Sequence, residues 1–219
     1  METMKNTYNI LYSGGSGRIE EKKSVFIAYA RPVHGEGDIA AFMDEIKKKY
    51  WDASHHCYAY VLSGDPAPKK FSDAGEPSGT AGKPILDVIE GNCLHDTMII
   101  VTRYFGGTLL GTGGLVRAYQ AAAKDSIVHS IITERHDGML LTYVIDYDFY
   151  GKLQKMAEKE PVYLLNPDFS DKIKLNIAVD KSFYVNIIDK VEELSAAKAG
   201  LIDTKEIYFT DINGKVEIL

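Results

Sequence analysis

The chain has 219 residues, of which 45% are hydrophobic and 26% charged, a composition that fits one large or two small globular cores and argues against a disordered chain. No apolar run approaches the roughly 20 residues needed to cross a bilayer, and the first residues, METMKNTYNILYSG, lack the pattern of a secretory leader, so no membrane association is expected. The net charge of −6 argues against general binding of nucleic-acid phosphates, although a local basic patch is compatible with it. With only two cysteines, Cys57 and Cys93, a disulfide framework is implausible and a cytoplasmic protein is predicted.

Residues 1–134 begin with strands and continue with alternating helices and strands. NTYNILYS and KKSVFIAYARPV are rich in β-branched and aromatic residues and predict two strands. A helix is predicted from Gly37-Asp38 onward, with Asp38 as its N-cap. Its apolar stripe consists of Ile39, Phe42, Met43, Ile46 and Tyr50.

The next strand is predicted in SHHCYAYVLSG, and a helix in GTAGKPILDVIEG. DTMIIVTRYF is a nearly continuous apolar run, which is typical of a strand buried on both faces. A glycine-rich loop then leads into a helix that is predicted to begin near Leu115. Its apolar stripe consists of Leu115, Tyr119, Ala122, Ala123, Ile127 and Ile131. This order predicts an α/β or α+β sandwich.

Residues 135–219 have a different pattern, so a domain boundary is expected near residues 134–138. Strand MLLTYVIDY is followed by a short helix in FYGKLQKMAEK, and then by PVYLLNPDF and DKIKLNIAVD as an antiparallel pair. A second helix is predicted with Ser182 as its cap and Gly200 as its stop, before KEIYFTDI as the last strand of this set, which a hairpin turn is predicted to connect to KVEIL. The order βαββαβ is the ferredoxin-like pattern, so the fold class is α+β.

The segment FSDAGEPSGTAGKPIL, residues 71–86, is the first candidate for chemistry. A phosphate-binding P-loop requires glycine at the first position of its motif and a hydroxyl directly after the lysine. Aligned on Gly82 and Lys83, this chain has Pro77 and Pro84 at those two positions. Because proline has neither an amide proton nor a hydroxyl, the segment is not an ATP-binding P-loop.

Two interpretations of this segment stay open. In the first, the small residues at 78–82 (Ser78, Gly79, Thr80, Ala81 and Gly82) form a nest of free amides for an anion, and Lys83 adds a positive charge. In the second, Asp73, Ser78 and Thr80 cap the following helix and Glu76 answers in a capping arrangement. Spacing alone favours capping, because helix starts nearly always need it.

A second glycine-rich segment, TRYFGGTLLGTGGLVRAY, covers residues 102–119. It contains Arg103 at the end of a buried strand and Arg117 in the first turns of a helix, where a cation opposes the helix dipole. The glycines predicted to form the turn, with a role in ligand binding, are Gly106, Gly107, Gly113 and Gly114. The sequence does not fit a dinucleotide fingerprint, because Val116 occupies the place of its third glycine. The arginines therefore either bind an anion or pair internally with Asp73 or Glu76.

The strand SHHCYAY places His55 and Cys57 on one face. Two neighbouring ligands do not make a zinc site, which normally needs three or four, and the other histidines have no complementary spacing. A His–Cys catalytic pair is possible in geometry but has no accompanying nucleophile signature. Neither a metal nor a cofactor is predicted.

These segments identify a family resemblance. KFSDAGEPSGTAGKPIL (70–86) and IVTRYFGGTLLGTGGLVRAYQAA (100–122) closely resemble the two signature stretches of the IMPACT/YigZ family. ASHHCYAYVL (53–62) resembles the family's H-x-C-x-A-Y stretch, with His55 and Cys57 in the matching positions.

The resemblance is strong over roughly residues 15–130, while the tail resembles the family's bacterial carboxyl-terminal domain in pattern only. It implies an amino-terminal domain like domain 2 of ribosomal protein S5 and a ferredoxin-like tail like domain V of elongation factor G. Eukaryotic relatives are linked to translational control under amino-acid starvation, through binding a partner of the sensing kinase, and they carry a further domain that is not expected here.

The leading hypothesis is a non-catalytic binding protein connected to translation. In it, Lys83, Arg103, Arg117 and the amides of residues 78–82 meet an anionic group such as RNA phosphate or a nucleotide. Its partner would be RNA, the ribosome or a translation-related protein, and the oligomeric state stays open. If Asp73 and Glu76 neutralise the cations internally, the same surface becomes a protein-contact surface.

The alternative is a small hydrolase or transferase. Asp73 or Glu76 would act as base or metal ligand, and Ser78, Thr80 or His55 would assist. A third interpretation is purely structural, in which the glycines allow helices to pack closely on the sheet.

Overall fold

The computed structural model describes residues 7–212 and 214–219 and has a mixed α+β fold, as the sequence predicted. The chain divides into two compact units, one covering Tyr8–Thr133 and the other the residues from Glu134 to the end. One continuous strand, β8 (Ile131–Ile145), carries the chain from the first unit into the second. No helix among the described residues is long and apolar enough to span a bilayer.

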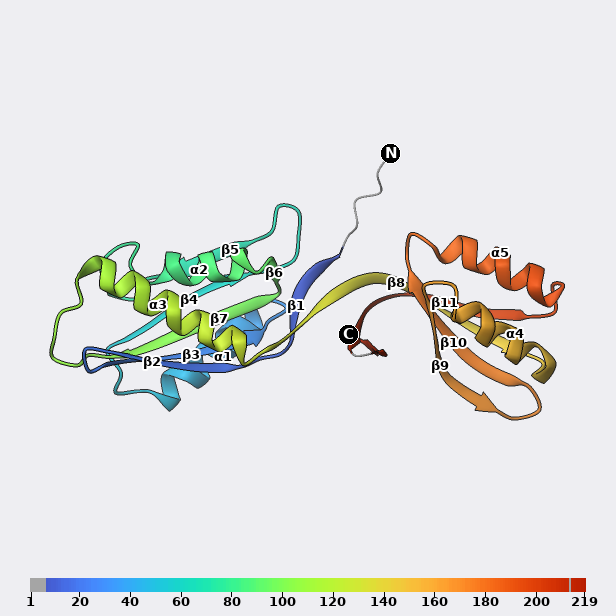
Figure 1. Ribbon diagram of the computed structural model, residues 1–219, viewed down its shortest axis with the longest axis horizontal. Helices are drawn as coiled ribbons and strands as arrows, with labels where there is room; N and C mark the ends of the chain where they lie inside the picture. Colours follow the sequence, from blue (N-terminus) through green and yellow to red (C-terminus); the bar gives the residue numbers. More distant parts are fainter. Residues whose placement is uncertain (1–6, 213) are drawn as a thin grey trace. The chain divides into compact units, whose positions relative to one another are not determined.

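The amino-terminal unit contains strands and three long helices (Figure 1). Its elements are β1 (Tyr8–Ser13), β2 (Ser16–Glu21), β3 (Ser24–Pro32), α1 (Glu36–Lys49), β4 (His55–Val61), β5 (Lys69–Ser72), α2 (Gly82–Gly91), β6 (Leu94–His95), β7 (Thr97–Tyr104) and α3 (Gly111–Val128).

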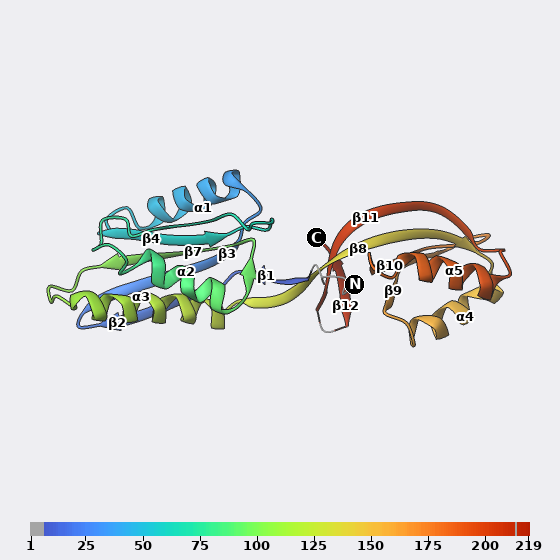
Figure 2. The ribbon, with the colours of Figure 1, turned by 90° about the horizontal axis from the view of Figure 1, so that it is seen from above.

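A five-stranded antiparallel sheet with the order β2-β3-β7-β4-β5 forms the middle layer of this unit. Helix α1 covers one face, and α2 and α3 cover the other (Figure 2). Residues Thr97 to Arg103 of β7 are all buried, which confirms the prediction of a strand buried on both faces. The strand is central and therefore supports both layers.

The carboxyl-terminal unit has the element order βαββαβ that the sequence predicted, followed by one more strand. Its elements after β8 are α4 (Tyr147–Ala157), β9 (Val162–Phe169), β10 (Ile173–Asp180), α5 (Tyr184–Ser195), β11 (Gly200–Ile212) and β12 (Lys215–Ile218). The strands pair antiparallel in the order β12-β11-β8-β10-β9. The predicted pairing of β9 with β10 is confirmed.

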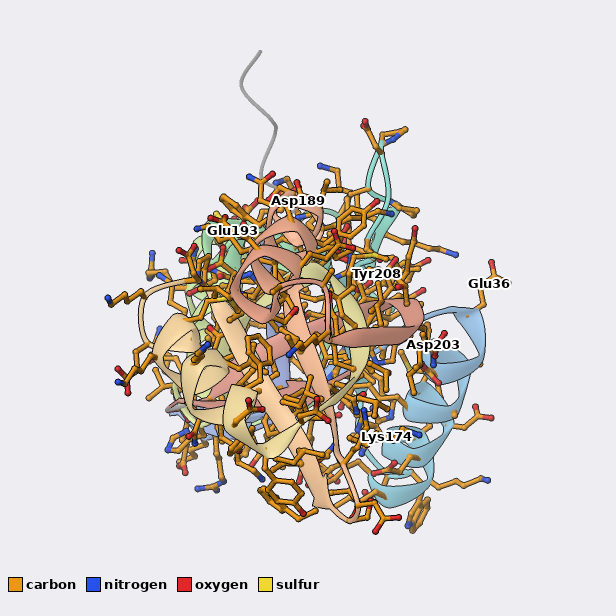
Figure 3. The ribbon with its side chains drawn as sticks, turned by 90° about the vertical axis from the view of Figure 1, so that its right-hand side faces the viewer. Glu36, Lys174, Asp189, Glu193, Asp203 and Tyr208 are labelled. Carbon is orange, nitrogen blue, oxygen red and sulfur yellow. The ribbon has the colours of Figure 1, made fainter. Side chains whose placement is uncertain are left out.

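One face of this second sheet packs against α4 and α5 through a core that includes Leu141, Leu153 and Val191. Lys174 of β10 and Asp203 of β11 project from the opposite face, whereas Asp189 and Glu193 project outward from α5 (Figure 3). The alternation along β10, with Ile173 and Leu175 buried beside exposed Lys174, follows the strand period of two.

Several predicted helix ends are wrong by a few residues. Helix α1 begins at Glu36, and Asp38 lies inside it, where its carboxylate accepts the N–H of His34 at 2.8 Å. Helix α5 is preceded by Phe183 rather than capped by Ser182, and it ends at Ser195, before Gly200 begins β11. These ends follow backbone geometry that side-chain type specifies only weakly.

Helix α3 begins at Gly111, four residues before the predicted start. Gly113 and Gly114 therefore belong to its first turn instead of to the preceding loop. Its predicted apolar stripe is buried as far as Ile127, but Ile131 belongs to β8 and is 49% exposed.

Candidate functional site

Both glycine-rich motifs lie at the same end of the amino-terminal sheet. Strands β4 and β7 are antiparallel, with His55 at the start of one opposite Arg103 near the end of the other. Strand β5 ends at Ser72, opposite Tyr58 of β4, so the chain leaves β5 at this end too. The connections 73–81 and 105–110 therefore lie next to each other.

Asp73 organises the first connection. Its Oδ2 accepts the N–H of Gly79 at 2.8 Å, and its Oδ1 accepts those of Ala81 at 3.0 Å and Gly82 at 2.8 Å. Burial alone would raise the pKa of Asp73, but the hydrogen bonds from Gly79, Gly82 and Ala81 outweigh it and lower that pKa. Asp73 thus holds α2 at its first residues, as the capping interpretation proposed.

The same three bonds correct the anion-nest interpretation. The amides of Gly79, Ala81 and Gly82 that were expected to receive an external anion already donate to the carboxylate of Asp73. Thr80 does not cap the helix, because its hydroxyl donates to the carbonyl of Pro77 at 2.7 Å. Ser78 is exposed and has no hydrogen bond among those described for residues 7–212.

Glu76 forms a buried ion pair with Arg103. Its Oε1 lies 2.7 Å from Nη1 of Arg103, and the side chains are 3% and 7% exposed. The same oxygen accepts the hydroxyl of Tyr119 at 2.8 Å. Burial, with the neighbouring Cys57 and Glu76, raises the pKa of Tyr119, so this hydroxyl stays protonated and donates. Of the internal pairings considered for the arginines, the one between Arg103 and Glu76 is therefore present, and Glu76 has no capping role.

Ser24, at the start of β3, connects this buried pair to the second connection. Its Oγ lies 3.4 Å from Nη2 of Arg103 and accepts the N–H of Gly106 at 3.1 Å. A Cβ on Gly106 would lie 2.1 Å from the backbone of Lys23, so only glycine fits there. Gly82 is confined in the same way, since a Cβ would come within 2.8 Å of the Ser72 backbone. These two glycines serve close packing, whereas Gly107 adopts a φ of +80° in open space.

Glu76, Arg103, Tyr119 and Ser24 form a buried polar cluster. His55 and Cys57 lie beside this cluster, but they do not form a catalytic pair. Nδ1 of His55 is 2.9 Å from the carbonyl of Ala74, and its Nε2 is 3.9 Å from Glu76. The sulfur of Cys57 is fully buried and lies 2.9 Å from the carbonyl of Asp73. Burial raises the pKa of the Cys57 thiol to about 12, so the thiol is protonated at neutral pH.

This environment predicts that Cys57 is inert toward thiol reagents. At pH 8 a disulfide reagent should modify the exposed Cys93 at once and leave Cys57 unmodified until the protein unfolds. In a Cys93→Ser variant, the reagent should label no cysteine rapidly in native buffer. In denaturant it should label one cysteine per chain, which is Cys57. Rapid native labelling of that variant would show that Cys57 is accessible and that the cluster is open.

Lys83 and Arg117 do not form the anion site that the sequence predicted. Lys83 pairs with Asp87 one turn along α2, and that hydrogen bond raises the pKa of Lys83. Arg117 is exposed in the second turn of α3 and has no ion pair among the described residues. Of the three cations predicted to meet an anion, two are therefore neutralised internally and Arg117 remains.

The exposed surface of the two connections is partly apolar. Phe105 is 50% exposed and Leu109 is 83% exposed, and both flank Gly107 in the second connection. Pro77, Ser78 and Gly79 are exposed in the first. We call residues 77–79 and 105–110 the loop surface.

The sequence missed Ser24 and the hydroxyl of Tyr119. The helical spacing predicts Tyr119 in the apolar stripe of α3, which is correct for its ring, but it does not indicate what the hydroxyl contacts. The available signal was a tyrosine on the buried face of a helix that follows motifs rich in charge. Within residues 7–212 and 214–219, no group of three or more His, Cys, Asp or Glu side chains could hold a metal ion.

Comparisons with known proteins agree with these motifs. The Impact N-terminal domain family matches residues 22–127. The IMPACT family member YvyE of Bacillus subtilis (strain 168) is 32% identical over 205 residues, which are 94% of this chain and 94% of YvyE. YigZ of Escherichia coli (strain K12) is 30% identical over 190 residues, 85% of this chain and 93% of that protein.

One solved structure resembles this chain over most of its length. The match to the crystal structure of a hypothetical protein has a TM-score of 0.60 at 28% identity and spans 91% of this chain and 97% of the other chain. The match to the structure of the two-domain translational regulator Yih1 spans 54% of this chain and 48% of the Yih1 chain, at 22% identity and a TM-score of 0.38. The architecture and the loop motifs define a two-unit α+β protein with a buried polar cluster at one end of its first sheet. The chain belongs to the IMPACT family.

Proposed function

We propose that this chain is a non-catalytic, cytoplasmic binding protein of translation, and that the loop surface contacts a protein component of the translation machinery. The observation that carries the proposal is the internal neutralisation of Glu76 by Arg103, next to a connection in which Phe105 and Leu109 are exposed. The charges of the motifs hold the loops, and apolar side chains are left for contact. Large apolar side chains that a short loop leaves exposed are candidates for a protein interface.

The link to translation rests on family membership and on the resemblance to eukaryotic members that act in translational control. We further propose a fold like domain 2 of ribosomal protein S5 for the first unit and like domain V of elongation factor G for the second. The strand order β11-β8-β10-β9 supports the second assignment. Likeness of fold is a weaker argument for function than the loop surface is.

The arrangement argues against the hydrolase alternative. Asp73 accepts three backbone hydrogen bonds, and Glu76 is buried against Arg103 and Tyr119. Neither carboxylate is therefore available to take a proton from a substrate.

Co-sedimentation with purified bacterial ribosomes tests the proposal. The wild-type protein should bind, and the double variant Phe105→Ser, Leu109→Ser should bind at least about tenfold more weakly, since hot spots of interfaces are buried apolar side chains. The control is Val128→Ser, which changes an apolar residue whose exposure (77%) lies between those of Phe105 and Leu109, at the other end of α3.

The outcomes separate two kinds of partner. No ribosome binding, or equal binding by the loop and control variants, would contradict the proposal. Binding that survives the loop substitutions, disappears in Arg117→Ala and weakens steeply with salt would identify an RNA-phosphate contact instead.

A further inference from the structure

The outer edge of β5 is an uncovered strand edge. Strand β5 is the last strand of the amino-terminal sheet and pairs only with β4 among the described strands. The N–H of Leu62 donates to the carbonyl of Pro68 at 2.8 Å, so these two opposed residues form a hydrogen-bonded pair. Hydrogen-bonded and non-hydrogen-bonded pairs alternate along an antiparallel ladder, and Lys69 and Phe71 fall in the non-hydrogen-bonded pairs. The backbone groups of Lys69 and Phe71 consequently point away from β4.

No hydrogen bond described in the chain occupies these groups. Lys69 and Phe71 are exposed, and no hydrogen bond from either amide is found among residues 7–212 and 214–219. Lysines often protect a sheet edge, but Lys69 is held against α2 by Glu90 at 2.5 Å. Phe71 is 43% exposed and adds apolar surface beside the free backbone.

A groove runs along the other face of the same edge. It has a volume of about 510 Å³ and lies between α1 and strands β4 and β5. Tyr58, Tyr60 and Lys70 line it from the sheet, and Met43 and Lys47 line it from α1. The hydroxyls of Tyr58 and Tyr60 have no hydrogen bond among those described, so they are available to a ligand.

The groove is basic although the chain is acidic overall. Its lining contains Lys47 and Lys70 against a single carboxylate, Glu36, which projects outward from the first turn of α1 (Figure 3). Neither lysine has an ion pair within the part of the chain that the structure describes. Burial, then Lys47 and His55, lowers the pKa of His56, so His56 adds no charge at neutral pH.

We propose that the β5 edge binds an extended acidic peptide segment of a protein partner, which adds to the sheet as a sixth strand. Backbone groups of Lys69 and Phe71 would pair with the peptide, since added strands are held by main-chain hydrogen bonds. Alternate peptide side chains point to opposite faces. One set would enter the groove, where acidic groups meet Lys47 and Lys70, and the other would contact Phe71. The β5 edge is separate from the loop surface and does not depend on it.

The probe is an acetylated, amidated octapeptide of alternating Glu and Val. Titration calorimetry with the full-length protein should detect binding, and a peptide of the same composition in the order EEEEVVVV should bind at least about tenfold more weakly. In amide NMR spectra, Lys69 and Phe71 should show the largest shifts and slowed hydrogen exchange. The Lys47→Glu, Lys70→Glu variant should weaken binding by about tenfold or more, while Lys159→Glu, Lys172→Glu in the carboxyl-terminal unit should leave it unchanged.

Backbone methylation of the peptide tests strand addition without altering the protein. Two octapeptides carry N-methyl groups at alternate residues, in complementary sets. One set should abolish binding, because its amides face β5, and the other should retain it. The proposal would be overturned if both methylated peptides, or the alternating and blocked-order peptides, bound equally well. It would also be overturned by no detectable binding up to about 1 mM, or by a groove that only a short single-stranded RNA occupies.

Discussion

Glu76→Ala is expected to lower the free energy of unfolding of the amino-terminal unit by about 3–5 kcal/mol, the cost of breaking a buried ion pair from one side. The substitution leaves the guanidinium of Arg103 buried, and Nε of that arginine already has no acceptor among the described groups. The hydroxyl of Tyr119 loses its acceptor as well. Urea unfolding, with hydrogen exchange of β7 as the readout for this unit, measures the effect.

Two further variants separate charge from packing. Asp87→Ala removes the exposed partner of Lys83 and should cost at most about 1 kcal/mol. Glu76→Leu combined with Arg103→Met should recover much of the lost stability, because an apolar pair of similar volume needs no compensating charge. If Glu76→Ala costs no more than Asp87→Ala, the pair is not buried in solution, and the account of how the loops are held is wrong.

Asp73→Asn is expected to cost about 2 kcal/mol at pH 7, because the carboxylate accepts three backbone N–H groups and an amide can replace only part of that acceptance. The residue fits the same volume, so the loss reports on hydrogen bonding and charge. Chemical denaturation of both proteins at a series of pH values is the measurement.

The pH dependence has a defined sign. The pKa of Asp73 is lowered in the folded state, so its contribution is fully present above the unfolded value of about 3.9 and is lost as pH falls through the lower folded value. The difference between wild type and Asp73→Asn should therefore be constant from pH 7 to about pH 5 and shrink below about pH 4. Asp87→Asn serves as the exposed control. A difference that persists unchanged to pH 2 would exclude the carboxylate as its source.

Much of the fold could be predicted because it depends on patterns that are local in the chain. The burial of β7 on both faces follows from its unbroken apolar run, and the order of elements in the second unit follows from alternation and helical spacing. Helix ends such as that of α5 were misplaced, since Ser182 and Gly200 are only weak local signals and tertiary contacts decide where a helix stops.

The sequence by itself determined the motifs, their separation from P-loop and dinucleotide sites, and the family to which the chain belongs. It could not decide whether Arg103 meets a ligand or a carboxylate, because Glu76 lies 27 residues earlier and only the pairing of β4 with β5 and β7 brings the two together. Spacing already favoured capping by Asp73, and the structure shows that its carboxylate occupies amides that the other interpretation left free for an anion. A charge removed from water must find a partner at short range, and that partner is chosen by the packing of the sheet and not by distance along the chain.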